Sequence, residues 1–289
     1  MSEAIQVPYS TGRNTPKLKV PEMTCDTHCH IFDPVRFPYK PSDTRNQPPA
    51  TVDVYRLLQK RLGISRCVVV TPSAYGSDNR CTMDAVKQLG EAARAVVVLD
   101  ENVTLDEIKK YHEQGARGVR FNIVSGASDS ITKIQRMAEK VAMTGWHMVF
   151  WMSADLIAAY EKELNSLPCQ IVFDHRGHLP AEQGVEHEAF SIISDMMRNK
   201  HAFVKLSALY HDSRTEGYAD TISVGKAYAN VNVDQLLWGT DWPHHSEFIA
   251  RKQMPDDAQL LDCLSEQVVD EKAIHKILVE NPARLYGFK

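Results

Sequence analysis

The sequence has 289 residues, of which 43% are hydrophobic and 24% are charged, and its formal net charge at pH 7 is −4. This composition excludes an intrinsically disordered chain, and the lack of a basic excess disfavours a nucleic-acid-binding protein. No run of 18 apolar residues occurs, so we expect no membrane-spanning helix.

The first 22 residues read as a polar arm that contains proline and lacks an apolar segment. Because a secretory signal requires such a segment, the sequence predicts a cytoplasmic protein. The six cysteines are scattered along the chain and several lie in apolar runs, which is typical of reduced, buried thiols. No change of composition marks a second domain, so residues 23–289 are predicted to form one domain.

Short apolar runs, most of them rich in Val, Ile and Phe, are spread along the whole chain. They are continuous rather than alternating and about five residues long, which is typical of strands covered on both faces of a parallel sheet. The predicted strands are residues 23–32, 66–71, 95–99, 118–123, 147–152, 170–174, 202–206 and 235–240.

Segments with a helical period of apolar residues lie between these runs. Residues 52–62 carry apolar side chains along one face, and Gly63 is placed to end that helix. Residues 104–114 open with Thr104 and carry Glu107 three residues later, which is the pattern of a capping box. Further helices are predicted at residues 83–93, 131–144, 156–164, 186–199, 219–229, 256–264 and 271–278.

This alternation of strands and helices predicts a single (β/α)8 barrel. A doubly wound open sheet is the alternative, but no glycine-rich nucleotide-binding loop follows the first strand. The loop at residues 33–49 contains Pro34, Pro38, Pro41, Pro48 and Pro49. We expect it to form a stiff wall over the mouth of the barrel.

In such a barrel the active site lies at the C-terminal ends of the strands. His28 and His30 lie two residues apart on the first strand, so both are expected to point the same way, with Asp26 below them. Cys25 and Cys29 are then expected to point toward the helices. Two imidazoles on one face can bind a metal or polarise a carbonyl group. A hydrogen-bonded histidine pair that caps the barrel core is the alternative.

Asp241 ends the last strand, which lies beside the first strand once the barrel closes. A carboxylate there can act as a base toward water, and a helix cap or a structural ion pair is the alternative. Arg120 on the fourth strand is expected to meet a carboxylate of the protein or of a substrate, because an uncompensated interior guanidinium is costly. His175 follows the sixth strand and can reach the same mouth.

A set of motifs in matching order resembles amidohydrolase-related barrels, and among these the 2-pyrone-4,6-dicarboxylate lactonase branch. The motifs are CDTHCHIF at residues 25–32, SAYGSDNR at 73–80, GVRFN at 118–122, DHRG at 174–177, VKLS at 204–207, WGTDWPH at 238–244 and NPARLYGF at 281–288. The resemblance extends over nearly the whole chain. It implies a single (β/α)8 barrel acting on lactones, usually sugar-acid or aromatic-catabolic ones that bear carboxylates.

The resemblance also implies roles for individual residues. Asp241 would activate water, Arg120 would bind a substrate carboxylate, and Ser73 would hydrogen-bond the substrate or a neighbouring loop. Three histidines would engage the lactone carbonyl, and these are His28, His30 and His175.

Further residues are predicted to line the pocket, and for several of them loop packing is the alternative. They are Tyr39, Asn79, Arg176, Tyr210, His211 and His244. Lys205 is predicted to form a structural ion pair with Asp174 or Asp26.

The sequence departs from many metal-dependent amidohydrolases, which place Lys or Glu at the fourth strand and His at the fifth. Here these positions are Arg120 and Trp151. Because a cation repels Zn²⁺ and an indole cannot bind it, we expect no metal cofactor. If a divalent metal such as zinc does bind, the expected ligands are His28, His30 and Asp241.

A second departure concerns the charge of the substrate. The dicarboxylate lactonases of this branch use additional arginines near the fourth strand and after the seventh, where this chain reads IVSG at residues 123–126 and YHDS at 210–213. His211, with Arg176 or Arg214, would replace these arginines only in part. A less anionic lactone, such as one derived from a sugar acid, is therefore expected as readily as the pyrone dicarboxylate.

Other functions stay open at this stage. A lactone isomerase would use the same pocket, with a substrate hydroxyl in place of water. A zinc-dependent decarboxylase or hydratase is disfavoured by Arg120 and Trp151, and a non-catalytic binding protein is disfavoured by Asp241 beside the histidine pair. The expected partner is a small-molecule lactone rather than a nucleic acid or a membrane, and the protein is expected to be a monomer or a small homo-oligomer.

Overall fold

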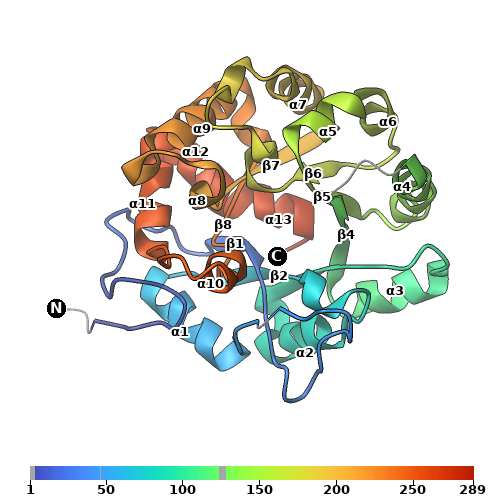
Figure 1. Cartoon of the computed structure of the whole chain (residues 1–289), viewed down its shortest axis with the longest axis horizontal. Coiled ribbons are helices and arrows are strands. Elements are labelled where there is room, and N and C mark those ends of the chain that lie inside the picture. The colour runs from blue at the N-terminus through green and yellow to red at the C-terminus, as the bar shows by residue number, and fades with distance from the viewer. Residues whose placement is uncertain (1–3, 46, 124–127) are drawn as a thin grey trace.

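A computed structural model describes residues 4–45, 47–123 and 128–289 of the chain. In this part of the chain, eight parallel strands form one sheet in which each strand pairs with the next along the sequence. Figure 1 shows the strands in the middle of the molecule with helices around them. The strands are β1 (Cys25–Cys29), β2 (Arg66–Val70), β3 (Ala93–Val97), β4 (Ala116–Ile123), β5 (His147–Met152), β6 (Ile171–Phe173), β7 (Ala202–Ser207) and β8 (Leu236–Gly239).

The sheet closes on itself just after β8, beside β1. The backbone N–H of Asp241 donates to the carbonyl of His28 at 2.8 Å, and the N–H of His30 donates to the carbonyl of Trp242 at 2.8 Å. An isolated bridge between Cys29 and Trp242 extends this pairing. The predicted (β/α)8 barrel is therefore confirmed, and its closure places the end of the last strand beside the histidines of the first.

The predicted helices are present with shifted ends, except that one of them is divided in two, and the short helices at residues 209–212, 245–249 and 281–286 were not predicted. Gly63 ends the first helix in the left-handed conformation with φ 72°, and Thr104 and Glu107 form the predicted capping box. The helix predicted at residues 156–164 is instead two short helices, because Tyr160 leaves the helical conformation with φ −109°. The helices are α1 (Val52–Leu62), α2 (Arg80–Leu89), α3 (Leu105–Glu113), α4 (Ser128–Ala142), α5 (Ala154–Ala159), α6 (Glu161–Asn165), α7 (Glu188–Arg198), α8 (Leu209–Asp212), α9 (Ala219–Asn232), α10 (His245–Ile249), α11 (Asp257–Gln267), α12 (Glu271–His275) and α13 (Asn281–Tyr286).

The N-terminal half of the barrel interior is filled by apolar side chains from most of the strands. Cys25 lies in this inner cluster, whereas Cys29 lies in the outer cluster under the helices, so the prediction that both point outward is wrong for Cys25. The pairing register of β1 on β2 shifts between Asp26 and Cys29, which interrupts the strict alternation of side chains. As a result, Asp26 accepts a hydrogen bond from the Tyr55 hydroxyl of α1 at 2.9 Å.

Two appendages lie against the barrel. In the N-terminal arm, the carbonyl of Pro8 accepts a hydrogen bond from the Trp242 indole at 3.0 Å, and the N–H of Thr11 donates to the carbonyl of Pro255 at 2.9 Å. Residues 1–3 of the predicted arm lie outside the described residues. The proline-rich loop is tied to the β2 side of the mouth, where the N–H of Lys40 donates to the carbonyl of Ala74 at 2.9 Å.

All six cysteines are free and buried, as predicted. None of the helices in residues 4–45, 47–123 and 128–289 combines the length and the hydropathy needed to cross a membrane.

Candidate active site

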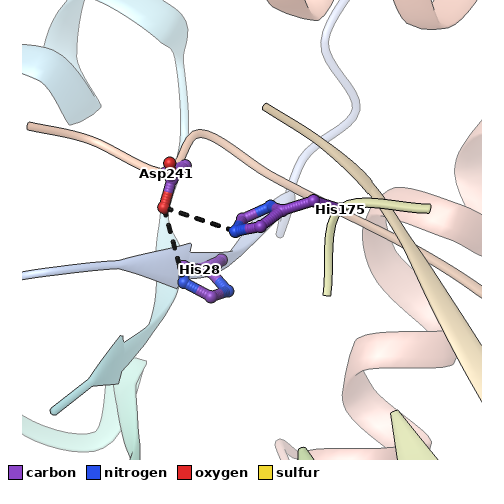
Figure 2. A group of neighbouring side chains, drawn as sticks. All are labelled: His28, His175 and Asp241. Atoms are coloured by element: carbon purple, nitrogen blue, oxygen red, sulfur yellow. Dashed lines mark ion pairs between the residues drawn. The ribbon is translucent and has the colours of Figure 1, made fainter. Parts of the chain in front are cut away.

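Three histidines and one aspartate meet at the C-terminal end of the barrel strands. The Oδ1 atom of Asp241 lies 3.5 Å from Nε2 of His28, 3.7 Å from Nε2 of His30 and 3.8 Å from Nε2 of His175. All four side chains are buried. Figure 2 shows His28 and His175 reaching Asp241 from different parts of the chain. The fold thus brings together the four residues that the sequence predicts to be catalytic.

The local backbone permits this close approach. A Cβ atom on Gly239 would lie 2.7 Å from the backbone nitrogen of His28, so the bare glycine lets β8 lie tightly against β1. His175 and Asp241 both have positive φ values, 48° and 62°. Such values are uncommon for residues other than glycine, and strained conformations of this kind cluster at functional sites.

The contacts behind His28 and His30 determine what each imidazole offers to the site. Nδ1 of His30 lies 2.7 Å from the Val70 carbonyl oxygen, which can only accept, so in the neutral ring Nε2 is the acceptor. Nε2 of His28 lies 3.3 Å from Nε2 of His30 and must then carry the proton between them. Nδ1 of His28 lies 3.0 Å from the Lys205 ammonium, which can only donate and favours the same tautomer of His28. It also lies 3.1 Å from Oδ1 of Asp174, and this contact favours the opposite tautomer.

The electrostatics of this centre favour neutral imidazoles beside an ionised carboxylate. Burial lowers the pKa of His28, and it lowers the pKa values of His30 and His175 well below the ordinary value. Burial alone would raise the pKa of Asp241, but His175, the hydrogen bond from His211 and the neighbouring His28 hold it well below its usual range. Asp241 is therefore a carboxylate at neutral pH and can accept a proton.

A buried ion pair lies directly behind His28. The Lys205 ammonium is 3.0 Å from Oδ1 of Asp174, and Nε of Arg120 is 3.5 Å from Oδ2 of the same carboxylate. Lys205 and His28 hold the pKa of Asp174 well below its usual range even though burial acts in the opposite direction. The predicted ion pair of Lys205 with Asp174 is thus confirmed, and it also orients an imidazole of the site.

The second carboxylate oxygen of Asp241 is held from the other side. The hydroxyl of Tyr210 donates to Oδ2 at 2.7 Å, and Nε2 of His211 lies 3.2 Å from the same atom. Burial raises the pKa of Tyr210 well above its ordinary value, and the adjacent Asp241 adds to the shift, so the phenol keeps its proton. Both residues were predicted to bind substrate, and the structure places them against Asp241.

A cavity of about 280 Å³ opens beside Arg120 and is also lined by Lys40, Ser73 and Asn122. Arg120 is 7% exposed, and its Nε faces Oδ2 of Asp174 at 3.5 Å. The hydroxyl of Ser73 accepts a hydrogen bond from Arg45 at 3.0 Å. Arg120, Lys40 and polar side chains therefore share the lining of this cavity with the apolar Val98, Leu99 and Phe121.

Other predicted pocket residues have different surroundings. The Asn79 amide is engaged with the protein, because its Oδ1 accepts from the Thr71 hydroxyl at 2.8 Å and its Nδ2 donates to the Val98 carbonyl at 2.8 Å. Arg176 is buried and forms an ion pair with Asp212 at 3.0 Å.

The Tyr39 hydroxyl is buried and has no partner among the described residues. The stretch 123–126 was used above to predict the charge of the substrate. Its residues 124–126 lie outside the described residues.

His245, the first residue of α10, was missed by the sequence reasoning. Its Nδ1 is buried without a partner in the part of the chain that the structure describes, and its ring centroid lies 5.3 Å from that of His30. Burial lowers the pKa of His245 to about 4. The one sequence signal was its position directly after the WGTDWPH motif, which does not distinguish it from His244.

Several side chains of the site could also act as metal ligands. His28, His175 and Asp241 each offer a ligand atom, and these atoms lie within 4.8 Å of one another. The predicted set with His30 is similarly close, with separations of 3.3 to 3.7 Å. Oδ1 of Asp174 lies 3.1 Å from Nδ1 of His28. A carboxylate in this position commonly orients a histidine that binds a metal through its other ring nitrogen. These donors fit a single divalent ion such as zinc.

The sequence is similar to known proteins along almost its whole length. A family model described as Amidohydrolase matches residues 25–288. The 2-pyrone-4,6-dicarboxylate hydrolase of Comamonas testosteroni is 32% identical, covering 94% of this chain and 92% of the relative. A 4-sulfomuconolactone hydrolase of Hydrogenophaga intermedia is also 32% identical, covering 95% of this chain and 92% of the relative. The D-galactarolactone isomerase of Agrobacterium fabrum is 27% identical, covering 99% of this chain and 97% of the relative.

Proposed function

Because this chain belongs to the amidohydrolase family, and because relatives that match over nine-tenths of it are lactone hydrolases, we propose that it hydrolyses a lactone. The observation that carries the proposal is the geometry around Oδ1 of Asp241, which lies within 3.8 Å of Nε2 of three neutral imidazoles. A base and hydrogen-bonding groups for a carbonyl oxygen thus face one point.

In the proposed reaction, Asp241 Oδ1 takes a proton from water as the oxygen attacks the lactone carbonyl carbon. The tetrahedral intermediate then breaks the ring carbon–oxygen bond, and Asp241 returns the proton to the departing alkoxide. A positioned general base of this kind contributes about 10²- to 10⁴-fold to the rate. The product is the ring-opened hydroxy acid.

The imidazoles have different roles in this scheme. His28 presents an Nε2–H because Lys205 faces its Nδ1 at 3.0 Å, and it donates to the oxyanion of the intermediate. His175, with Nδ1 2.9 Å from the Ser207 hydroxyl, presents its Nε2 to the same centre and is assigned the same role. A preorganised donor of this type contributes about 3–4 kcal/mol to transition-state stabilisation. His30 bonds through Nδ1 to Val70, so its Nε2 offers one lone pair. This lone pair accepts from His28 before the substrate binds, and it accepts from the attacking water once His28 donates to the oxyanion.

The proposed substrate bears a carboxylate. Arg120, whose Nε faces Asp174 at 3.5 Å, and Lys40 line the cavity of about 280 Å³. A guanidinium has five N–H donors in a planar fork, so it can bind a substrate carboxylate in addition to Asp174. We assign the cavity to the acidic substituent of the lactone, and Ser73 to a hydrogen bond at its rim.

A divalent metal, if it binds, would be held by His28, His175 and Asp241 and would lower the pKa of a bound water. That arrangement requires the other tautomer of His28, with the Nδ1 proton donated to Asp174 at 3.1 Å. The contact with Lys205 favours the tautomer in which Nε2 is a hydrogen-bond donor, so the proposed mechanism uses the side chains of the chain itself.

Lactone isomerisation is the second candidate, and the match to D-galactarolactone isomerase over 99% of the chain is the observation that favours it. The same base would then deprotonate a substrate hydroxyl, which would attack the carbonyl in place of water. Net water addition separates this reaction from hydrolysis.

The proposal is tested by a panel of lactones in which acid release is followed with a pH indicator. The panel holds sugar-acid lactones, muconolactones and pyrone carboxylates, each paired with its methyl ester, and the protein is analysed for metal and assayed with and without chelator. We expect acid release from one class of free acid, a weaker response from its ester, and no effect of the chelator. Loss of activity on chelation would contradict the metal-free mechanism, and the absence of acid release from every lactone would contradict hydrolysis.

A further inference from the structure

A chain of polar side chains continues from Asp241 through Tyr210 and His244 to Asp257. The Tyr210 hydroxyl lies 2.7 Å from Oδ2 of Asp241 and 2.8 Å from Nδ1 of His244. Nε2 of His244 lies 3.1 Å from Oδ2 of Asp257. His244 and Asp257 are fully buried. The members come from α8, the turn before α10, and the start of α11, which lie on the same side of the barrel in Figure 1.

The protons available to these groups give the chain a direction. Tyr210 has one proton, and an ionised Asp241 can only accept it, so the Tyr210 oxygen must accept its second hydrogen bond from Nδ1–H of His244. The far nitrogen of His244 then lies 3.1 Å from Asp257, and a hydrogen bond there requires a second proton, held between Nε2 of His244 and the carboxyl group. The other oxygen of Asp257 has no partner in the described residues. Burying a carboxylate with one oxygen unpartnered costs free energy. The group that this carboxylate faces is the imidazole that orients Tyr210.

We propose that Tyr210, His244 and Asp257 form a positioning relay, in which Asp257 fixes His244, His244 fixes Tyr210, and Tyr210 holds Oδ2 of Asp241. This inference rests on the proposed function and deepens it, because the relay leaves Oδ1 as the proton-accepting atom of the base. A carboxylate held at one oxygen by Tyr210 and His211 cannot rotate about its own axis without losing both hydrogen bonds. The oxygen that faces the three imidazoles is thereby kept free for water.

The first test is the Tyr210→Phe variant, which removes one hydroxyl. We expect kcat to fall by about 10- to 100-fold, the range for a hydrogen bond to a charged group, with KM and the melting temperature nearly unchanged. Tyr286→Phe is the matched control, since its buried hydroxyl has no partner in the described residues and lies at the opposite end of the barrel. Wild-type kcat in Tyr210→Phe, or a change confined to KM, would overturn the relay.

A double-mutant cycle tests whether Asp257 acts through Tyr210. Asp257→Asn alone is expected to lower kcat about three- to tenfold, because it acts across two intervening hydrogen bonds. The double variant Tyr210→Phe with Asp257→Asn should be no slower than Tyr210→Phe alone. Losses that multiply would show that the two residues act independently and would overturn the relay.

A spectroscopic arm separates failure of the relay from failure of the proposed function. In protein labelled with ¹⁵N at histidine, the ring N–H signals of His244, assigned with a His244→Gln variant, should shift in Tyr210→Phe and Asp257→Asn and stay fixed in Tyr286→Phe. Unchanged His244 signals in both relay variants would overturn the relay whether or not any lactone is opened. Shifted signals in a protein that opens no lactone would retain the hydrogen-bonded chain and reject the proposed reaction.

Discussion

The two ends of the barrel bury histidines in different surroundings. At the mouth, defined here by His28, His30, His175 and Asp241, the imidazoles turn Nε2 toward a carboxylate. At the floor, the N-terminal end of the strands, His147 packs edge-on against Tyr286 with ring centroids 4.9 Å apart.

The electrostatic effect of burial is nevertheless the same at both ends. Burial lowers the pKa of His147 to about 3, and it also lowers the pKa values of His28 and His175. All of these imidazoles are therefore neutral at pH 7. Burial does not distinguish a reactive histidine from a packed one, but a carboxylate within reach and a second ring nitrogen fixed by the protein do. Changes at the mouth should therefore remove activity, and changes at the floor should remove stability.

The largest expected effect is on activity at the mouth. Replacing Asp241 with Asn removes the base but keeps the shape of the side chain, so we expect kcat to fall by about 10²- to 10⁴-fold. The melting temperature, measured by circular dichroism, should change little. A kcat within threefold of the wild-type value would remove Asp241 from the role of base.

Lys205 both pairs with the buried Asp174 and contacts the imidazole of His28, so its replacement should affect stability and activity. Lys205→Met leaves the buried Asp174 without its closest cation, and breaking a buried ion pair in this way destabilises a fold by about 3–5 kcal/mol. Activity should also fall, because Nδ1 of His28 loses the donor that sets its tautomer. Stability is measured by urea denaturation and activity by kcat of the folded protein.

A second substitution separates the two effects of Lys205→Met. Adding Asp174→Asn removes the unpaired charge, so the double variant should regain part of the stability without regaining kcat. Recovery of both properties together would show that Lys205 does not act on His28.

Two strand glycines make a matched pair for the comparison. A Cβ on Gly239 at the mouth would lie 2.7 Å from the backbone nitrogen of His28, and a Cβ on Gly118 at the floor would lie 2.7 Å from Nε2 of His147. Each change to Ala should cost about 1–3 kcal/mol of stability through overpacking. The Gly239→Ala variant alone should also lower kcat, because His28 must move. Equal kcat losses in the two variants would contradict the assignment of activity to the mouth and of stability to the floor.

The smallest expected effect is a pH dependence of stability that belongs to one carboxyl group. Burial raises the pKa of Asp26 from 3.8 to about 6, so the folded state binds this proton more tightly than the unfolded state. The stability from this group is fully present below pH 3.8 and is lost as the pH rises through about 6. The free energy of unfolding of the wild type, measured relative to Asp26→Asn, should therefore fall between about pH 4 and pH 7. A difference that rises over this range would contradict the assignment.

The sequence was sufficient for the fold because each strand is a continuous apolar run and the helices between them carry recognisable caps. It also placed Asp241 beside His28 and His30, since closure of a barrel joins the last strand to the first. These inferences depend on strand order and on local patterns, and both can be read from the amino-acid sequence.

The parts that the sequence did not predict depend on geometry across elements. The register shift in β1 turned Cys25 inward, and no local pattern marks such an irregularity. The relay of Tyr210, His244 and Asp257 joins three elements through side chains whose directions only the folded backbone sets. Asn79 looked available for substrate because nothing in the sequence shows that its amide bonds to Thr71 and Val98.

The most direct test of the proposed hydrolysis is whether an oxygen atom of water enters the product. The lactone that releases acid most rapidly is opened by the wild-type protein in H₂¹⁸O, and the product is analysed by mass spectrometry. We expect one ¹⁸O atom in the new carboxylate of the ring-opened acid, because in the proposed mechanism Asp241 directs water to the lactone carbonyl. A rearranged lactone that carries no label would contradict hydrolysis and would assign the same pocket to isomerisation.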